Sequence, residues 1–335
     1  MSKPQISVIA CHHVGDLVYK FVESVKKSTG VTYEIIIMTS DEKLAATGIP
    51  HCWVHYHEGM PAAKRNAGVR VAKADYVAFF DDDVEIDERC LYYLYHSLYQ
   101  HQPGMSYGKL HKADEPTRFD EAGGYLTATG FIWSRAGQNI VDTGQYDSYD
   151  PILAGKSASC IINKSLFNKV GGFDEDFEIL GEETDLSWRV WLAGYKVRFC
   201  PMAVGIHYFN TIYKPAKLYY TSKRVNYNGC RNYIVMLFKN LETHNLWKIL
   251  PIHILIWFGA SFAMLITMKL ESGWNILKGI AYVIRHIGLL LEKRKFVQER
   301  RKVSDEELFK SIFKTTPRGY YMERFKRYVS IGLHG

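Results

Sequence analysis

The sequence contains no closely spaced pair of cysteines, although it has six of them. They lie at positions 11, 52, 90, 160, 200 and 230 of a chain of 335 residues. This spacing excludes a zinc ribbon and gives no disulfide framework, so we expect a reducing compartment. The first residues, MSKPQISVIA, also lack a long apolar segment followed by a small-residue cleavage site. We therefore expect no secretory signal peptide and a cytoplasmic location.

Internal repeats and long glycine- or proline-rich segments are missing as well. A repeat architecture or a disordered linker is therefore not expected before about residue 230. With 47% hydrophobic and 23% charged residues, the chain is apolar enough to bury a large core. One compact domain is the simplest interpretation of this part of the chain.

An excess of positive charge is missing from the first 240 residues and is concentrated after them. The net charge is +7, and residues 241–335 contain 16 Lys and Arg against 8 Asp and Glu, whereas the rest contains 26 against 27. Such an asymmetry is typical of a segment that meets an anionic surface, either lipid headgroups or nucleic acid. A solvated basic helix is the alternative.

The beginning of the chain has the pattern of a parallel α/β sheet. Residues 6–11 and 34–39 are short runs rich in β-branched residues, and the apolar residues between them recur at helical spacing. Pro61 then opens a helix through PAAKRNAGVRVAKA, and residues 76–80, YVAFF, form the next strand. Ligands of such sheets bind beyond the carboxyl ends of the strands, so we expect site residues directly after them.

Three successive aspartates follow the strand at residues 76–80. In an extended backbone the side chains of Asp81 and Asp83 point the same way, so they can share one Mg²⁺ or Mn²⁺, while Asp82 faces elsewhere. A divalent cation would also relieve the repulsion between adjacent carboxylates. A solvated acidic turn is the alternative interpretation of the three residues alone.

Two segments together resemble family-2 glycosyltransferases of the GT-A fold. They are PAAKRNAGVRVAKADYVAFFDDDVEID at residues 61–87 and GGFDEDFEILGEETDLSWRVWLAGYKVRFCPMAVGIHY at residues 171–208. The family has an ARN-like helix before a strand that ends in a DxD motif, and a GGFDE turn before an acidic catalytic motif. The order and spacing agree over roughly residues 5–240. The resemblance implies a Rossmann-like, mostly parallel central sheet and an inverting transfer of a sugar from a nucleotide-diphosphate donor to a hydroxyl.

The resemblance also implies a metal site. Asp81 would contact the donor ribose or the metal shell, Asp82 would lie beside the donor, and Asp83 would bind the metal. His207, in GIHYF, matches the position at which a histidine often completes this site. A neutral imidazole with carboxylate and phosphate oxygens suits Mn²⁺ somewhat better than Mg²⁺.

For the donor nucleoside, the resemblance is weaker. The residues expected to contact it are Thr39 and Asp41, with Arg65 and Asn66 near the ribose or phosphates. Relatives commonly have a proline-threonine-tyrosine-asparagine type turn after the first strand, where this chain has residues 10–13, ACHH. The base therefore stays open between dTDP- and UDP-linked sugars.

The catalytic base is expected in GEETDLSWRVW. The resemblance aligns Glu183 with the base, and Glu182 or Asp185 could take this role instead. A position at a helix N-terminus makes a capping role the alternative for these carboxylates.

The C-terminal region has two apolar patterns beside a basic cluster. Residues 249–268 are uncharged and approach the ~20 residues needed to cross a bilayer. Six of the ten residues 293–302, KRKFVQERRK, are basic and favour the cytoplasmic side, so a re-entrant or in-plane helix is expected. An amphipathic face follows the apolar run and is typical of a monotopic membrane anchor; a dimer interface or core packing is the alternative. Its residues are Ile276, Leu277, Ile280, Val283, Ile284, Ile287, Leu290 and Leu291.

We therefore expect a GT-A domain at residues 1–240 and a helical, basic, membrane-associated region at residues 241–335. The segment RNYIVMLFKN and the region after it resemble enzymes of bacterial cell-surface polysaccharide assembly, including rhamnosyltransferases. This implies a lipid-linked glycan acceptor, a peripheral or monotopic position on the cytoplasmic face of the inner membrane, and no nucleic-acid partner. The alternatives are a non-catalytic membrane scaffold and a sugar-nucleotide nucleotidylyltransferase, although the glycine-rich phosphate loop of the latter is missing.

Overall fold

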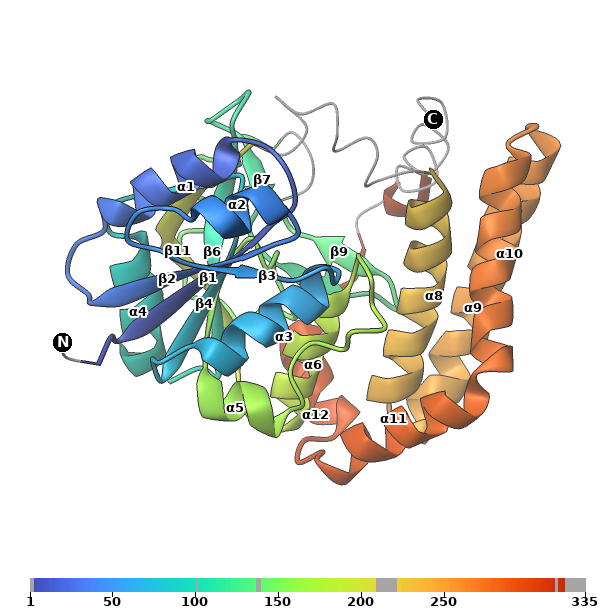
Figure 1. Ribbon diagram of the computed structural model, residues 1–335. Helices are drawn as coiled ribbons and strands as arrows, with labels where there is room; N and C mark the ends of the chain where they lie inside the picture. Colours follow the sequence, from blue (N-terminus) through green and yellow to red (C-terminus); the bar gives the residue numbers. More distant parts are fainter. Residues whose placement is uncertain (1–2, 101, 137–139, 209–221, 317–318, 323–335) are drawn as a thin grey trace.

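The computed structural model of the protein describes residues 3–100, 102–136, 140–208, 222–316 and 319–322. In these residues a twisted sheet flanked by helices lies beside a group of long helices, α8, α9 and α10 (Figure 1). The chain therefore has an α/β part and a helical part in contact, as predicted.

The central sheet of the α/β part is mixed. Its strand order is β3-β2-β1-β4-β10-β6-β11-β5, with β7 paired to β6. Strands β1 to β4 are parallel to one another, whereas β10 runs antiparallel between β4 and β6. The strands are β1 Ile6–His12, β2 Tyr33–Thr39, β3 Trp53–Tyr56, β4 Tyr76–Asp81, β5 Val84–Ile86, β6 Met105–Lys112, β7 Phe119–Glu121, β10 Ser159–Asn163 and β11 Val197–His207. Two further strands, β8 Gly124–Leu126 and β9 Ile132–Ser134, form a small separate sheet.

Helices cover both faces of the central sheet. One core contains apolar residues of α1 and α4, and the other contains those of α3, α5 and α6. These helices are α1 Leu17–Lys26, α2 Glu42–Thr47, α3 Pro61–Val71, α4 Cys90–Gln100, α5 Lys164–Lys169 and α6 Glu182–Leu192. The predicted strands at residues 6–11, 34–39 and 76–80 and the helix opened by Pro61 are confirmed.

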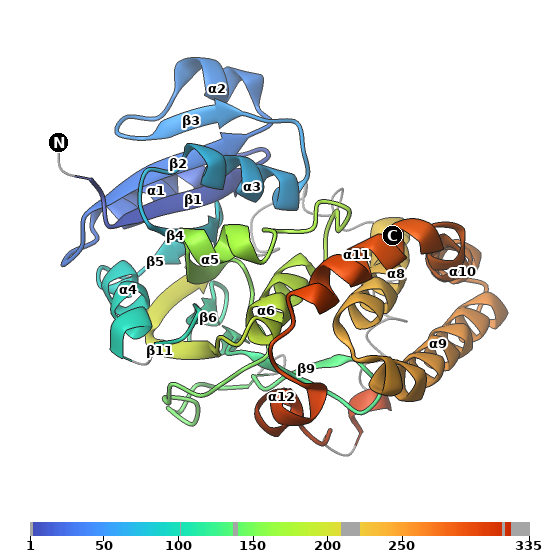
Figure 2. The same cartoon turned by 90° about the horizontal axis from the view of Figure 1, so that it is seen from below.

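The C-terminal helices pack against one another and against α6. They are α8 Ser222–Asn240, α9 Thr243–Ile266, α10 Leu270–Arg285, α11 Ile287–Glu299 and α12 Asp305–Ile312. In the view from below, α6 lies between the sheet and α8, and α11 passes beside both helices (Figure 2). Residue 240, where a domain boundary was expected, is the last residue of α8, and α8 itself packs with the helices that follow it.

Helix α9 is long enough and apolar enough to cross a membrane. The mean hydropathy of its most apolar window of 18 residues is 2.1, and only 28% of that window is buried in the protein. One side of the helix packs inward through Ile249, His253, Trp257, Ser261 and Met264. The opposite side is exposed and apolar.

The expected amphipathic face at residues 276–291 is divided between two helices. Ile276 and Ile280 of α10 are buried against α8 and α9, which is the core-packing alternative. Ile284 and Leu291 are 73% and 53% exposed, whereas Leu290 is buried. Core packing therefore accounts for Ile276, Ile280 and Leu290, whereas Ile284 and Leu291 are exposed.

The basic cluster at residues 293–302 is also partly internal. Lys293 forms ion pairs with Asp174 and Asp176, each at 2.5 Å. Arg294 donates to the carbonyls of Phe238 and Leu241 at the end of α8. These two cations hold α11 to the rest of the protein, so the cluster as a whole does not face an outside surface.

Candidate active site

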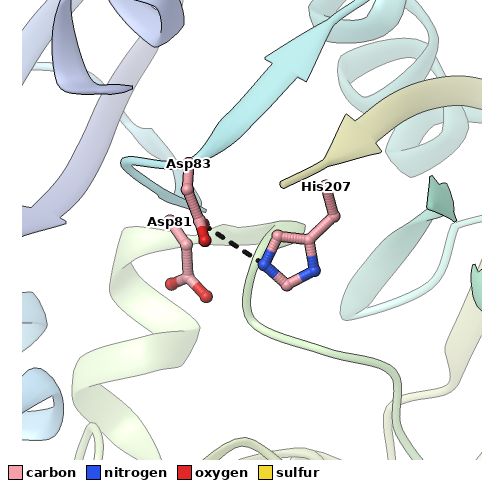
Figure 3. Close-up of side chains that lie close together, drawn as sticks. All are labelled: Asp81, Asp83 and His207. Atoms are coloured by element: carbon pink, nitrogen blue, oxygen red, sulfur yellow. Dashed lines mark ion pairs between the residues drawn. The ribbon is translucent and has the colours of Figure 1, made fainter. Parts of the chain in front are cut away.

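The three aspartates occupy the tight turn between β4 and β5. Strand β5 pairs with the end of β11, where His207 lies opposite Val84. The backbone amide of Tyr208 donates to the Asp83 carbonyl at 2.9 Å, which fixes the turn against β11. One ligand atom from each of Asp81, Asp83 and His207 lies within 4.8 Å of the others (Figure 3). Residues separated by more than a hundred positions thus meet as the sequence predicted.

The surroundings of His207 favour metal binding through its Nε2 atom. Nδ1 lies 2.8 Å from Asp120 Oδ2, and Nε2 lies 3.2 Å from Asp83 Oδ1. A carboxylate on Nδ1 fixes the ring and its tautomer, which is a common arrangement behind a histidine ligand. Asp120 itself forms an ion pair with Lys156 at 2.6 Å. Asp120 was not predicted as a site residue, because it lies in the short edge strand β7 and belongs to no motif.

Without a metal, His207 holds a proton. Burial lowers its pKa, but the charge of Asp83 and the hydrogen bond with Asp120 outweigh burial and raise the pKa to about 9. A divalent cation would take the place of this proton between the carboxylates. The donor set of two carboxylates and one imidazole fits Mn²⁺ or Mg²⁺.

Arg65 connects this cluster to the acidic motif. Its side chain is 3% exposed, with Nη2 at 2.8 Å from Asp81 Oδ1 and Nη1 at 3.0 Å from Glu182 Oε1. The guanidinium also lies over the ring of Phe173, 5.4 Å from its centroid. Helix α3 therefore positions a cation between β4 and the start of α6.

The acidic motif begins α6 after a left-handed turn. Leu180 and Gly181 have φ values of 70° and 91°. Only glycine adopts this conformation readily, so Leu180 is strained. Two hydrogen bonds from Asn232 of α8, each 2.8 Å long, hold the carbonyls of Ile179 and Leu180. The expectation of a helix N-terminus at this motif is confirmed, and Gly181 is the N-cap.

The carboxylates of the motif have different surroundings. Asp185 is fully buried, and it accepts from Arg189 at 2.9 Å, Lys239 at 3.1 Å and Asn240 at 3.0 Å. An enclosed, fully paired carboxylate cannot reach a substrate hydroxyl, so the structure gives Asp185 a structural role in place of the expected catalytic alternative. Glu182 is occupied by Arg65.

Glu183 is the half-buried carboxylate of the three. Among the described residues, no Lys, Arg or His forms an ion pair with it. Burial and the charge of Glu182 raise its pKa well above the usual value for glutamate. Such a carboxylate holds a proton more strongly than an ordinary glutamate, as a general base requires.

Asp82 faces away from the metal cluster, as predicted. Its Oδ2 atom lies 2.5 Å from Nδ1 of His12, which is buried at the end of β1. Burial raises the pKa of Asp82. The pair joins the carboxyl ends of β1 and β4, where a donor nucleoside would lie in a sheet of this kind.

Three of the expected nucleotide contacts have structural partners. Thr39 is fully buried and accepts from the Asp41 amide, and Asp41 caps α2 through the amides of Lys43 and Leu44. Thr39 therefore has a structural role in place of the expected nucleoside contact. The Asn66 amide bonds both backbone groups of Phe173. Thr39 and Asp41 have local partners, whereas Phe173 lies more than a hundred residues from Asn66, so spacing alone did not reveal this contact.

Lys64 was not predicted as a site residue, yet it reaches the carboxyl ends of β1 and β2. It is 2% exposed and donates to the His12 carbonyl at 2.7 Å and to Ser40 Oγ at 3.1 Å. Burial lowers its pKa. A cation at this edge adds positive charge where an anionic donor would lie.

The part of the chain that contains the three aspartates is similar to known proteins. Residues 7–146 match the family "Glycosyl transferase family 2". The chain is 30% identical over 177 residues to the pre-mycofactocin glycosyltransferase of Mycobacterium tuberculosis, a match that covers 47% of this chain and 33% of that protein. It is 25% identical over 165 residues to a probable N-acetylgalactosaminyltransferase 9 of Caenorhabditis elegans, covering 46% and 28%. The matches thus span about a third of the length of these relatives.

Solved structures share the fold over most of the chain. GalNAc-T7, crystallised with UDP, GalNAc and Mn²⁺, has a TM-score of 0.62 at 16% identity, covering 92% of this chain and 56% of that one. S. aureus TarS residues 1–349, in complex with UDP-GlcNAc, has a TM-score of 0.55 at 15% identity, covering 88% and 89%. The α/β part therefore has the GT-A-like fold that the sequence predicted. Residues 7–146 thus match glycosyl transferase family 2, and the fold around them is GT-A-like.

Proposed function

We propose that the protein is an inverting, metal-dependent glycosyltransferase that moves a sugar from a nucleoside-diphosphate sugar to a hydroxyl group. The observation that carries this proposal is the link through Arg65. It joins Asp81 of the metal-type cluster directly to Glu182, next to the half-buried Glu183. A site for the diphosphate and a general base thus lie at one edge of the sheet.

The proposed reaction is a single displacement. Glu183 accepts the proton of the acceptor hydroxyl while that oxygen forms a bond to the anomeric carbon of the donor sugar. The bond between this carbon and the diphosphate oxygen breaks, and its electron pair leaves with the nucleoside diphosphate. One displacement inverts the anomeric centre.

Asp81, Asp83 and His207 would hold the metal, with Asp120 fixing the histidine ring. A divalent ion in this place supplies positive charge to the diphosphate as it departs. Mn²⁺ in the GalNAc-T7 structure and the mixed oxygen and nitrogen ligands support Mn²⁺ over Mg²⁺. Lys64 adds charge on the nucleoside side.

We propose UDP-linked or dTDP-linked sugars as donors. Two structures of similar fold hold UDP and UDP-GlcNAc, which supports the uridine member of the pair. For the acceptor, we propose a lipid-linked glycan of cell-surface polysaccharide synthesis. The exposed apolar side of α9 supports this choice, because it would keep the protein on the cytoplasmic face of a membrane.

Nucleotide binding tests the donor and the metal together. We expect one of UDP, dTDP, GDP and CDP to raise the melting temperature with Mn²⁺ present and to have no effect with EDTA. Asp83→Ala should remove this metal-dependent shift, because it deletes one of three ligands. Glu88→Gln, an exposed carboxylate in the segment after β5, is the matched control. Equal shifts with Mn²⁺ and with EDTA would refute metal dependence, and no shift with any nucleotide would favour a non-catalytic scaffold.

A further inference from the structure

Arg65 binds two carboxylates that belong to different parts of the proposed active site. One guanidinium nitrogen contacts Asp81 at 2.8 Å, and another contacts Glu182 at 3.0 Å. The side chains of Arg65 and Glu182 are 3% and 8% exposed, so water does not weaken the second contact much. The planar guanidinium is suited to fix two acceptors at a set angle.

Helix α3 also holds the turn that leads to the acidic motif. Asn66, the residue after Arg65, donates to the Phe173 carbonyl at 2.9 Å and accepts from the Phe173 amide at 3.0 Å. Neighbouring residues of one helix thus anchor both ends of the segment between Phe173 and Glu182. The direction in which Glu182 points is therefore set by α3 as well as by α6.

The bridge leaves one polar atom on each side without a hydrogen bond. Arg65 Nε and Glu182 Oε2 are both buried and have no hydrogen-bond partner in the structure. Unpaired buried groups cost free energy. Among the hydrogen bonds of the described residues, the forked contact is therefore what ties Arg65 to Asp81 and Glu182.

This arrangement separates two adjacent glutamates. Glu182 is committed to a cation, whereas Glu183 has no ion-pair partner among the described residues. We infer that Arg65 is a positioning residue that holds Glu182 and so makes Glu183 the base, while aligning α6 with the metal cluster through Asp81. The inference rests on the proposed function and deepens it.

A double-mutant cycle tests the inference. We expect Arg65→Gln to lower kcat by about 100-fold, the size of effect that a small misplacement of a reacting group produces. The KM of the sugar nucleotide should change less than about threefold, because the metal ligands remain. Arg65→Lys should recover only part of the loss, since a point charge cannot form the fork. Arg65→Gln combined with Glu182→Gln should be no slower than the slower single variant.

Arg70→Gln is the matched control, an exposed arginine in the last turn of the same helix. An Arg65→Gln variant with normal kcat and a raised KM would overturn the inference, since Arg65 would then contact the sugar nucleotide. Additive losses in the double variant would also overturn it. The unfolding free energies of the same four proteins form a second cycle that needs no turnover. A wild type without transfer activity refutes the proposed function, whereas additive unfolding free energies refute the link itself.

Discussion

At the scale of single residues, charge partners divide the acidic motif into different roles. Glu182, Glu183 and Asp185 lie within one turn of α6, so their positions in the sequence are nearly equivalent. Their partners come from elsewhere: Arg65 from α3, and Lys239 and Asn240 from α8. The residue without a cation is the one that can accept a proton.

Glu183→Gln tests this assignment. We expect kcat to fall by about 10²- to 10⁴-fold, the usual contribution of a general base, while nucleotide binding stays unchanged. In the wild type, kcat should rise with pH, because the raised pKa keeps Glu183 protonated, and inactive as a base, at lower pH. The variant should lack this rise. The measurement is the pH profile of kcat beside a nucleotide titration, and an unaltered profile in the variant would reject Glu183 as the base.

The proximity of Asp81, Asp83 and His207 is predictable from the sequence because strand ends bring these residues together. Asp81 and Asp83 alternate along an extended backbone, and His207 ends a strand beside them. The structural role of Asp185 could not be predicted from the sequence, since the partners of that carboxylate, Lys239 and Asn240, lie more than fifty residues away. Lys64 was not predicted for a similar reason, because its contacts depend on how α3 crosses the ends of β1 and β2.

At the scale of helices and loops, α8 supports the segment that carries the base. Asn232 holds the strained turn at Leu180, and Arg231 donates to the Asp176 carbonyl at 2.6 Å. Lys239 and Lys293 both bind Asp174 at 2.5 Å. A helix assigned by sequence to the end of the catalytic domain is therefore also the support of its acidic loop.

Asp174→Asn should destabilise the protein by about 3 kcal/mol, because two cations lose their partner in a largely buried place. Burial raises the pKa of Asp174, but Lys239 and Lys293 outweigh it and lower the pKa below the usual value. A lowered pKa contributes stability above the unfolded value of about 3.9, and this contribution is lost as pH falls below it. Urea unfolding of both proteins at pH 7 and near pH 3 should therefore show a smaller difference in acid. An equal difference at both pH values would contradict this ion-pair account.

Residues 276–291 are helical apart from the break between α10 and α11, as their periodicity predicted. Periodicity alone, however, does not predict which part of the protein packs on an apolar face. Ile276 and Ile280 face α8, where Gly279 lets the helices approach closely: a Cβ there would lie 2.9 Å from the Tyr227 carbonyl oxygen. Close packing of this kind depends on a partner helix that the local sequence does not specify.

At the scale of the whole molecule, one side of α9 carries a row of exposed apolar residues. Trp247, Leu255, Phe262 and Ile266 are 65–75% exposed, with Phe258 at 46% between them. These residues recur at helical spacing over about 28 Å at 1.5 Å per residue. Contiguous apolar surface of this extent marks an interaction site, and a lipid surface agrees with its composition.

Phe262→Glu should weaken binding to vesicles that contain anionic lipid by about tenfold or more, because a charge replaces an aromatic ring in the apolar face. The melting temperature should stay nearly constant, since Phe262 is 66% exposed. Val71→Glu, an exposed apolar residue at the end of α3, is the matched control. Flotation of the three proteins with vesicles is the measurement. Unchanged flotation of Phe262→Glu would exclude this face as the lipid contact, and a concentration-dependent change in molecular mass would assign it to a second copy of the chain.

The hydrogen bonds from Asn232 to the turn at Leu180 also limit how this gene can be recombined. A chimera that takes the α/β part from one relative and the helical part from another would exchange the donor of these bonds without exchanging its acceptors. The two parts must therefore be inherited together or change in step, even though the acidic motif and α8 are separated in the sequence.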